Sequence, residues 1–284
     1  MDGKGAQRTE TMNTKILFTD LDGTLLNDKK EITPGNQAAI DRALSLGHKI
    51  VISTGRPLAS ARIQAERLGL TKEGCYAITY NGGQIYDTYR QKTLYGRPVP
   101  RELIRPVFEE AYRWNLHIQT YSATHVLTER DCPEIQGYTR GTLLPYQVVA
   151  DVNAALSEAP YKLLAIDEHD HAHLEAFRQK ILADYSGILD SFFSSDIYLE
   201  IVPVGISKGF AVKWMCDYLD IPITDSVAAG DAQNDIAMLE AAHVGAVMRN
   251  ASPDIALHGT YITQADNNHD GVAEIIHRFI LEDI

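Results

Sequence analysis

Residues 15–24 read Lys-Ile-Leu-Phe-Thr-Asp-Leu-Asp-Gly-Thr, and the fold can be worked out from this stretch. A short apolar run ends in two aspartates, which indicates a buried strand over residues 15–19. The Asp-Gly pair that follows favours a turn, so we expect Asp20 and Asp22 at the carboxyl end of the strand. Taken alone, the two aspartates fit a simple turn as well as they fit a functional site.

The residues after this stretch alternate between the patterns of helices and strands. Thr33-Pro34 is typical of a helix start and Gly47 of a helix end. Repetition of strand and helix at this spacing predicts a right-handed parallel sheet. The elements that we expect are a helix at 33–47, a strand at 48–53, a helix at 57–68 and a strand at 76–80.

The middle of the chain has a different pattern. Between residues 84 and 195 the runs alternate and are rich in aromatic residues, which favours antiparallel strands with one open face. Helical stretches are expected there at 102–114 and 173–185. After Pro203 the first pattern returns, with helices at 207–218, 234–242 and 271–279 and strands at 226–229 and 244–248.

These patterns predict an α/β protein with two domains. The core is a Rossmann-like, doubly wound parallel sheet formed by residues 12–83 and 200–284, and an α+β domain is inserted at 84–199. Residues 1–11 are polar and lack the apolar centre of a secretory signal. We interpret them as a disordered tail or an upstream extension, with Met12 as an alternative start.

Composition limits the kinds of partner. The formal net charge of −12 argues against nucleic acid or an anionic membrane as partner, because both need a basic face. No apolar run approaches the roughly 18 residues of a membrane span. Cys75, Cys132 and Cys216 are too scattered for a disulfide framework, which favours a reducing compartment and the cytoplasm. Small phosphorylated ligands are not excluded, because they need only a local positive site. A homo-oligomer is also compatible with this composition.

Polar residues stand at the ends of four predicted strands. In an open parallel sheet, ligands bind outside the carboxyl ends of the strands. Thr54-Gly55-Arg56 offers a hydroxyl and backbone N–H groups where a helix begins, which suits a phosphate, although an N-cap explains this triplet alone better. The four residues are Asp20, Thr54, Asn81 and Asp231.

Two clusters in the last third of the chain extend this set. Gly230–Asp235 follows a predicted strand and, by itself, fits a turn and a helix cap. Lys208 opens a predicted helix, where its charge is unfavourable beside the positive helix N-terminus unless an anion is bound. A solvated lysine is the alternative. Aspartates and one lysine at strand ends would suit a divalent metal held against a phosphate.

Two other patterns compete with this interpretation. Residues 205–209 match the Gly-x-Ser-x-Gly nucleophile elbow, so Ser207 with His269 downstream would make a serine acyl hydrolase. That hypothesis leaves the acidic clusters unexplained. His169 and His173 are spaced to bind a metal from one helix face, but a solvated loop and helix start explains them more simply.

Taken in order, Asp-x-Asp-Gly-Thr, Thr-Gly-Arg, Ser-Lys-Gly and Gly-Asp-x-x-Asn-Asp resemble the four motifs of the haloacid dehalogenase superfamily. The closer match is its Cof-type phosphatase branch. Three further stretches look like that branch: Tyr80–Gly83, Asn250-Ala251 and Asp270–Ala273. The resemblance covers the whole parallel domain, and the inserted segment matches the branch's cap domain in position and size.

The resemblance implies a Mg²⁺-dependent phosphatase that acts on small phosphorylated metabolites, such as sugar phosphates or phosphorylated cofactors. A phosphomutase of the same superfamily and a non-catalytic phosphate sensor are the alternatives. By resemblance, Asp20 would be the nucleophile that forms an aspartyl-phosphate, and Asp22 would act as the acid and then the base.

The resemblance also assigns the binding residues. The implied Mg²⁺ ligands are the Asp20 carboxylate, the Asp22 backbone carbonyl and Asp231, with Asp235 and Asn81 in support. The implied phosphate-binding residues are Thr54, Gly55, Lys208 and Asn234.

Overall fold

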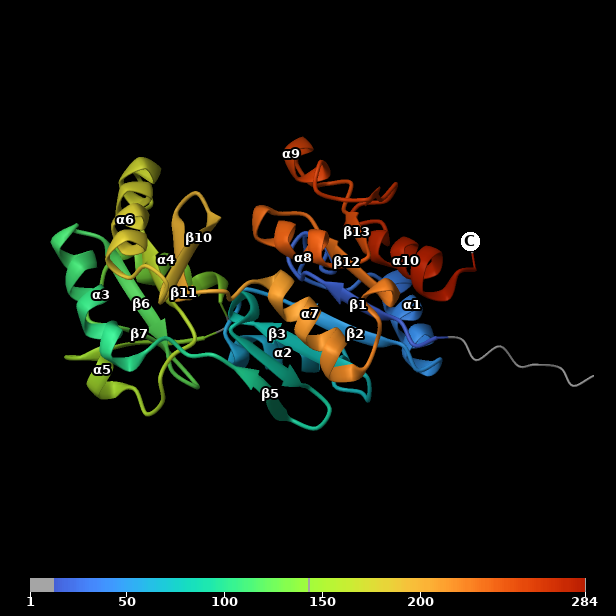
Figure 1. Ribbon diagram of the computed structural model, residues 1–284, viewed down its shortest axis with the longest axis horizontal. Coiled ribbons are helices and arrows are strands. Elements are labelled where there is room, and N and C mark those ends of the chain that lie inside the picture. Colours follow the sequence, from blue (N-terminus) through green and yellow to red (C-terminus); the bar gives the residue numbers. More distant parts are fainter. Residues whose placement is uncertain (1–12, 143, 284) are drawn as a thin grey trace, which may run out of the picture.

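The chain folds into a core domain and a cap domain, each built around its own sheet (Figure 1). The structure is a computed structural model that describes residues 13–142 and 144–283. The predicted tail at 1–11 and the alternative start at Met12 lie outside the described residues. The cap lies at the left of Figure 1 and the core domain at the right, and the chain passes between them twice.

The core strands are β1 (Ile16–Thr19), β2 (Lys49–Ser53), β3 (Cys75–Thr79), β4 (Gln84–Asp87), β5 (Lys92–Gly96), β12 (Ser226–Gly230), β13 (Val244–Val247) and β14 (Tyr261–Ile262). They form one eight-stranded sheet in the order β14-β13-β12-β1-β2-β3-β4-β5. The pairs from β14 to β3 are parallel, while β4 and β5 join antiparallel. The predicted parallel sheet is confirmed.

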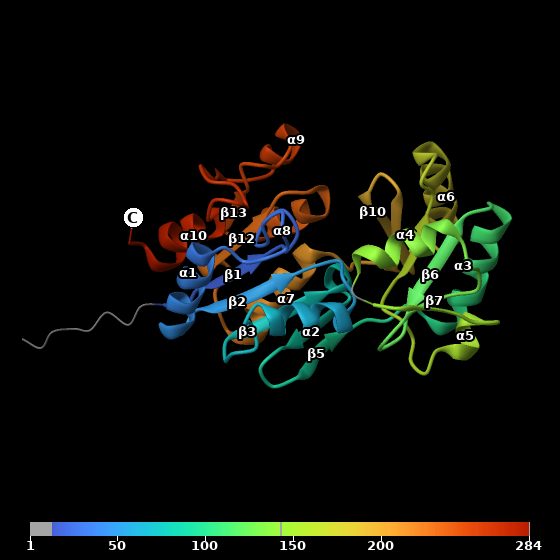
Figure 2. The same cartoon turned by 180° about the vertical axis from the view of Figure 1, so that it is seen from behind.

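Helices cover both faces of this sheet, as Figures 1 and 2 show from opposite sides. Leu17 and Ile50 pack on one layer of helices, and Ile16 and Phe18 pack on the other, because successive strand residues face opposite ways. The first layer is α1 (Pro34–Ser45), α2 (Leu58–Arg67) and α10 (Gly271–Ile275) with its π-helical extension Ile276–Leu281. The second layer is α7 (Lys208–Leu219), α8 (Ile236–Ala241) and α9 (Pro253–Ala256).

The cap sheet consists of β6 (His117–Tyr121), β7 (Val126–Thr128), β8 (Tyr146–Val148), β9 (Leu163–Ile166), β10 (Leu189–Ser195) and β11 (Tyr198–Pro203). The strand order is β10-β11-β9-β6-β7-β8, and only the β7–β8 pair is parallel among those described. One face packs on α3 (Arg101–Arg113), α5 (Val152–Ala155) and α6 (His171–Asp184). The other face carries α4 (Pro133–Gly141).

The predicted domain boundaries at 83/84 and 199/200 are wrong. The hairpin of β4 and β5 belongs to the core sheet, so the first core segment extends to Gly96. At the other end, β11 pairs with β9 and β10 in the cap and runs to Pro203. Alternating residues mark an antiparallel strand, but they do not reveal which sheet the strand joins.

Most of the expected helices begin close to the predicted residue. The α1 helix begins at Pro34 as predicted, although the Thr33 hydroxyl makes no capping hydrogen bond. Short 3₁₀ turns, which were not predicted, occur at Tyr80–Gly82, Ile223–Asp225 and Gln233–Asp235. Within the described part of the chain, the helices are all too short or too polar to cross a lipid bilayer.

Candidate active site

The carboxyl ends of neighbouring core strands carry the polar residues that the sequence singled out. Because β12, β1, β2 and β3 are adjacent and parallel, their ends lie along one edge of the sheet. Asp231 follows β12, Asp20 follows β1 and Thr54 follows β2, while Asn81 lies in the turn after β3. The structure therefore brings these four strand ends together.

Lys208 lies at the centre of the site. Its ammonium group is 2.6 Å from Asp20 Oδ1 and 2.6 Å from Asp235 Oδ1, and the residue is only 1% exposed. Burial alone would lower the pKa of Lys208, but the two carboxylates outweigh burial and raise the pKa above its ordinary value. Lys208 is therefore a buried permanent cation, not the solvated lysine that was the alternative.

Three carboxylates crowd around this lysine. Asp20, Asp231 and Asp235 each place one oxygen within 4.8 Å of the others. Burial raises the pKa of Asp20 well above its ordinary value and repulsion from Asp235 adds to the effect, while Lys208 offsets part of it. Burial, with repulsion from Asp235, likewise raises the pKa of Asp231 to about 6. The trio holds more negative charge than Lys208 alone balances.

The oxygens of the trio are not equally free. Asp235 Oδ1 binds Lys208, and its Oδ2 accepts hydrogen bonds from the backbone N–H groups of Asp231 and Ala232 at 3.1 Å each. Asp231 Oδ1 accepts a hydrogen bond of 2.7 Å from the Thr24 hydroxyl. Asp235 is thus fully used in positioning its neighbours, which leaves Asp20 and Asp231 with oxygens for a ligand.

The donor set fits a hard divalent cation. Such ions prefer carboxylate and carbonyl oxygens, which are the groups gathered here, and a cation would relieve the repulsion that raises both pKa values. Gly23 lets its loop reach Asp231, because a Cβ at Gly23 would lie 2.4 Å from Asp231 Oδ2. Asn250 Nδ2 donates to the Gly23 carbonyl at 2.8 Å and holds this loop in place.

The Asp22 side chain lies outside the acidic trio. One of its oxygens is 2.8 Å from Arg56 Nη2, and the other is 2.8 Å from Lys30 Nζ. Burial raises the pKa of Asp22, but Arg56 and Lys30 outweigh burial and hold the pKa below its ordinary value. Arg56 could have been found from its place in Thr-Gly-Arg, whereas nothing in the sequence points to Lys30.

Thr54 follows β2 and Asn81 follows β3, so along the edge of the sheet both lie on the other side of Asp20 from Asp231. The buried Thr54 hydroxyl accepts a hydrogen bond of 3.1 Å from the Arg56 N–H, and the Thr54 carbonyl accepts one of 3.1 Å from the Asn81 N–H. Asn81 has left-handed backbone angles, φ 55° and ψ 31°. This unusual backbone turns the Asn81 side chain towards the crevice, where it shares a cavity with Lys208 and Asn234.

One cap residue reaches the core site, and the sequence analysis did not identify it. Lys162 is 2% exposed, and its Nζ donates to the Gly55 carbonyl at 2.8 Å. The same nitrogen lies 2.6 Å from Glu200 Oε2 and 5.1 Å from the centre of the Tyr121 ring. A lysine next to the apolar run that forms β9 was the available signal, because such a charge needs a buried partner.

The structure does not support the serine hydrolase hypothesis. The Ser207 hydroxyl accepts a hydrogen bond of 3.0 Å from the Phe210 N–H, so it caps α7. His269 is exposed and pairs with Asp266 at 2.7 Å. Neither residue therefore has the contact that a nucleophile and its base require.

The alternative histidine site is also unsupported. The α6 helix begins at His171 with Asp170 as its N-cap, so His169 lies outside the helix and shares no helix face with His173. His173 pairs with Asp167 at 2.9 Å. Over residues 13–142 and 144–283, Asp20, Asp231 and Asp235 form the one group of this kind close enough to share an ion.

The fold and the site together define a capped α/β protein that gathers aspartates at the carboxyl ends of its parallel core strands. The profile of the haloacid dehalogenase-like hydrolase family matches residues 17–276, so the chain belongs to this family. This confirms the predicted superfamily and its Cof-type branch.

Individual relatives match over nearly the whole chain. A Streptococcus pyogenes protein with a provisional phosphatase name is 30% identical over 95% of this chain and 100% of its own. The 5-amino-6-(5-phospho-D-ribitylamino)uracil phosphatase of Bacillus subtilis is 28% identical over 96% of this chain and 98% of its own. A crystal structure of a haloacid dehalogenase-like hydrolase from Bacteroides thetaiotaomicron has a TM-score of 0.85 at 28% identity, covering 94% of this chain and 99% of that one.

Proposed function

We propose that this protein is a Mg²⁺-dependent phosphatase of small phosphorylated metabolites. The observation that carries the proposal is the buried Asp20 carboxylate, which contacts Lys208 at 2.6 Å and lies within 4.8 Å of Asp231 and Asp235. A nucleophilic carboxylate beside a fixed cation is what phosphoryl transfer to an aspartate needs. The phosphatase names of full-length relatives support the same substrate class.

In the first step, an Asp20 oxygen attacks phosphorus and the bond from phosphorus to the leaving oxygen breaks. The product is an aspartyl-phosphate, and the leaving oxygen takes a proton from Asp22. In the second step, water attacks phosphorus, Asp22 takes a proton from that water, and the bond from phosphorus to Asp20 breaks. Free phosphate leaves, and both aspartates return to their starting state.

The contacts of Asp22 distinguish these two steps. Paired with Arg56 and Lys30, Asp22 is held as a carboxylate, which is the form that activates water. Before the first step, Asp22 must therefore move away from these cations and take a proton from solvent, because both cations favour its charged form. The Asp22 side chain is 38% exposed, so it has room to move.

The remaining residues would bind the phosphoryl group and the ion. The Thr54 hydroxyl, the Gly55 backbone, Lys208 and Asn234 would hold the phosphoryl oxygens. Asp20, the Asp22 backbone carbonyl and Asp231 would hold Mg²⁺, with Asp235 orienting Lys208 and the loop. When bound, the cation offsets the repulsion between these carboxylates and the phosphate.

Replacement of the nucleophile tests the proposal. We expect Asp20→Asn to lower Mg²⁺-dependent phosphate release from p-nitrophenyl phosphate by at least about a thousandfold, because no covalent intermediate can form. Asp41→Asn is the matched control, since Asp41 is an exposed aspartate paired with Lys72. Circular dichroism checks that both variants are folded. Activity retained in folded Asp20→Asn would refute the assignment.

A further inference from the structure

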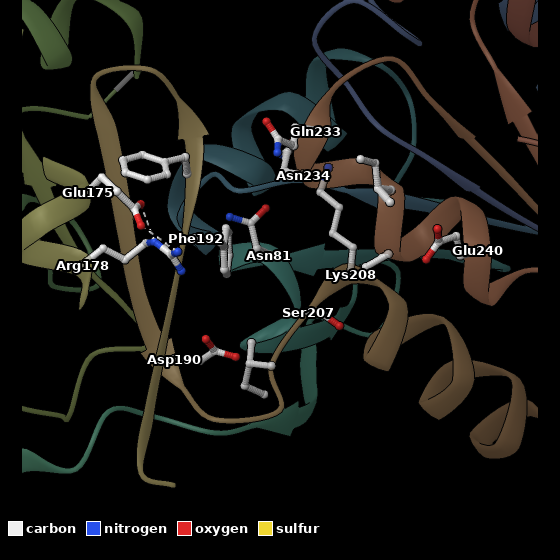
Figure 3. A pocket seen from close by; sticks show the side chains of 14 residues that line it. Asn81, Glu175, Arg178, Asp190, Phe192, Ser207, Lys208, Gln233, Asn234 and Glu240 are labelled. Atoms are coloured by element: carbon white, nitrogen blue, oxygen red, sulfur yellow. Dashed lines mark hydrogen bonds and ion pairs between the residues drawn. The ribbon is translucent and has the colours of Figure 1, made fainter. Parts of the chain in front are cut away.

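A cavity of about 490 Å³ lies between the core domain and the cap (Figure 3). Asn81, Lys208 and Asn234 line its core side, next to the proposed phosphate position. Residues of α6 and β10, including Arg178 and Phe192, form its cap side. Its volume falls within the range of small-molecule sites. The cavity therefore has room for the part of a substrate that extends beyond the phosphate.

Asn81 independently indicates that a polar ligand enters this cavity. The residue is 1% exposed, and neither its Nδ2 nor its Oδ1 has a hydrogen-bond partner within residues 13–142 and 144–283. A buried amide left without partners is costly, so such groups normally meet a ligand or water. In Figure 3 the amide lies between Arg178 and Lys208, facing the cavity.

Among the described residues that line the cavity, Arg178 is the one cation from the cap, and three of its five N–H donors are already engaged. Its Nε and Nη2 bind the two Glu175 oxygens at 2.7 and 3.0 Å, and its Nη1 donates to the Ser191 carbonyl at 3.4 Å. A bidentate pair of this kind neutralises the guanidinium and fixes its plane. Arg178 is therefore a poor receptor for a second anionic group of the substrate.

The rest of the cap wall is suited to bind a positively charged group. Asp190 and Phe192 are two apart on β10, so they lie on the same face of the strand. Both line the cavity, and the pKa of Arg178 is raised mainly by its pair with Glu175 and further by the nearby Asp190. With Glu175 and Asp190 against one arginine, this wall carries a net negative charge. A carboxylate beside an aromatic ring is a recognised setting for an ammonium group.

We propose that this cavity binds the leaving group of the substrate and selects a group that carries an amine over one that carries a second anion. The proposal rests on the proposed phosphatase function and extends it to the substrate class. Asn81 meets polar atoms of the leaving group near the phosphate, while Asp190 and Phe192 contact the amine. Phosphomonoesters with a carboxylate or a second phosphate at that end are disfavoured.

Three esters of similar size test the selection: glucosamine 6-phosphate, glucose 6-phosphate and 6-phosphogluconate. The reacting phosphate is the same, while the other end is positive, neutral or negative. We expect kcat/KM to fall in that order, with at least about a tenfold ratio between the first and the last. An equal or reversed order would overturn the proposal.

The Asp190→Asn variant localises the effect. It should reduce the ratio at least about fivefold, mainly through KM, because one charge facing the amine is removed. Asp184→Asn is the matched control, since Asp184 is a cap aspartate at the end of α6 that pairs with Lys180. The control should leave the ratio unchanged. A ratio unaffected by Asp190→Asn would overturn the proposal.

Binding separates this inference from the proposed function. If p-nitrophenyl phosphate is not hydrolysed with Mg²⁺, the proposed function fails, and calorimetry with Asp20→Asn still decides the inference. We expect the amino ester to bind tightest to that variant and the carboxylate ester weakest. Loss of that order, or no binding of any ester, contradicts the inference. If p-nitrophenyl phosphate is hydrolysed in the same set of experiments, only the inference fails and the phosphatase function stands.

Discussion

Two buried lysines, one in each domain, are held in different ways. Lys208 of the core domain contacts two carboxylates, one of them 188 positions away in the sequence. Lys162 of the cap contacts one carboxylate, Glu200, and the carbonyl of Gly55 in the core domain. The difference indicates that Lys208 supplies charge to the site, whereas Lys162 fixes the position of a loop.

Stability alone does not explain either lysine. Removing a charge pair from water costs several kcal/mol per ion, so a buried pair often contributes no more than well-packed apolar residues. Lys208 is placed where a phosphate would need a cation. Lys162 is placed where it joins β9 of the cap to the loop of Thr54 and Arg56. The two lysines can be separated by experiment.

The largest effect in this comparison is expected for Lys208→Met. Turnover of p-nitrophenyl phosphate should fall about a hundredfold to a thousandfold, because a preorganised cation beside the phosphoryl group is lost. The free energy of unfolding should fall by about 3–5 kcal/mol, since Asp20 and Asp235 are left buried without their partner. Kinetics and urea unfolding measure the two effects.

Lys213→Met is the control for that variant. Lys213 is exposed on the same helix, so removing its charge should change neither quantity appreciably. Normal turnover in folded Lys208→Met would contradict a role in phosphate binding.

A smaller effect is expected for Lys162→Met. The value of kcat/KM should fall about tenfold to a hundredfold, because the loop of Thr54 loses the contact that fixes it and displacements of about 1 Å carry such costs. Glu200 is then left unpaired, which also lowers stability. The double variant Lys162→Met/Glu200→Leu removes both charges and separates the two causes.

The comparison of single and double variants decides the role of Lys162. If the loop contact matters, both variants lose activity. If the double variant recovers full kcat/KM, Lys162 serves only to neutralise Glu200. Lys180→Met, which removes a partly exposed cap lysine paired with Asp184, should keep the activity of the unaltered protein.

The smallest expected effect is a pH dependence within the cap. Burial lowers the pKa of His117, which contacts Cys132 Sγ and Gln119 Oε1 at 3.0 Å each. Glu134 opposes this shift and Arg130 adds to it. The unfolded chain therefore binds a proton at His117 more readily than the folded chain does. The contribution of neutral His117 to the stability of the fold is complete above the ordinary histidine pKa, and it is lost as the pH falls through the pKa of the folded state.

Thermal unfolding between pH 7 and pH 5 measures this effect. The cap should lose stability as the pH falls, and His117→Gln should flatten the dependence. His48 in the core domain also has a pKa lowered by burial, so its variant His48→Gln serves for comparison. An unchanged slope in His117→Gln would show that other groups control the acid sensitivity of the cap.

The core of the site could be predicted because its signals are local. Asp20, Thr54 and Asp231 each end or follow a short apolar run, and the rules of parallel sheets bring such ends together. The order of the motifs was as informative as their composition. The same local logic explains why most of the core helices and strands begin near the predicted residues.

The remaining features depend on how distant segments pack. The hairpin of β4 and β5 joins the core sheet through pairing that no local pattern encodes. The contact of Lys162 with Gly55 exists only once the cap is docked, and Lys30 reaches Asp22 only after its own turn has formed. The roles of these residues could be recognised only from the contacts that they make in the folded structure.

The path of the chain out of the cap has one more consequence. β11 ends at Pro203, and α7 begins with Lys208. Ser207 anchors the first turn of α7, and Gly205 has φ +79°, a backbone angle that suits a hinge. Rotation of the cap would therefore be absorbed over residues 204–206. The link out of the cap would thus let that domain turn while Lys208 keeps its place beside Asp20.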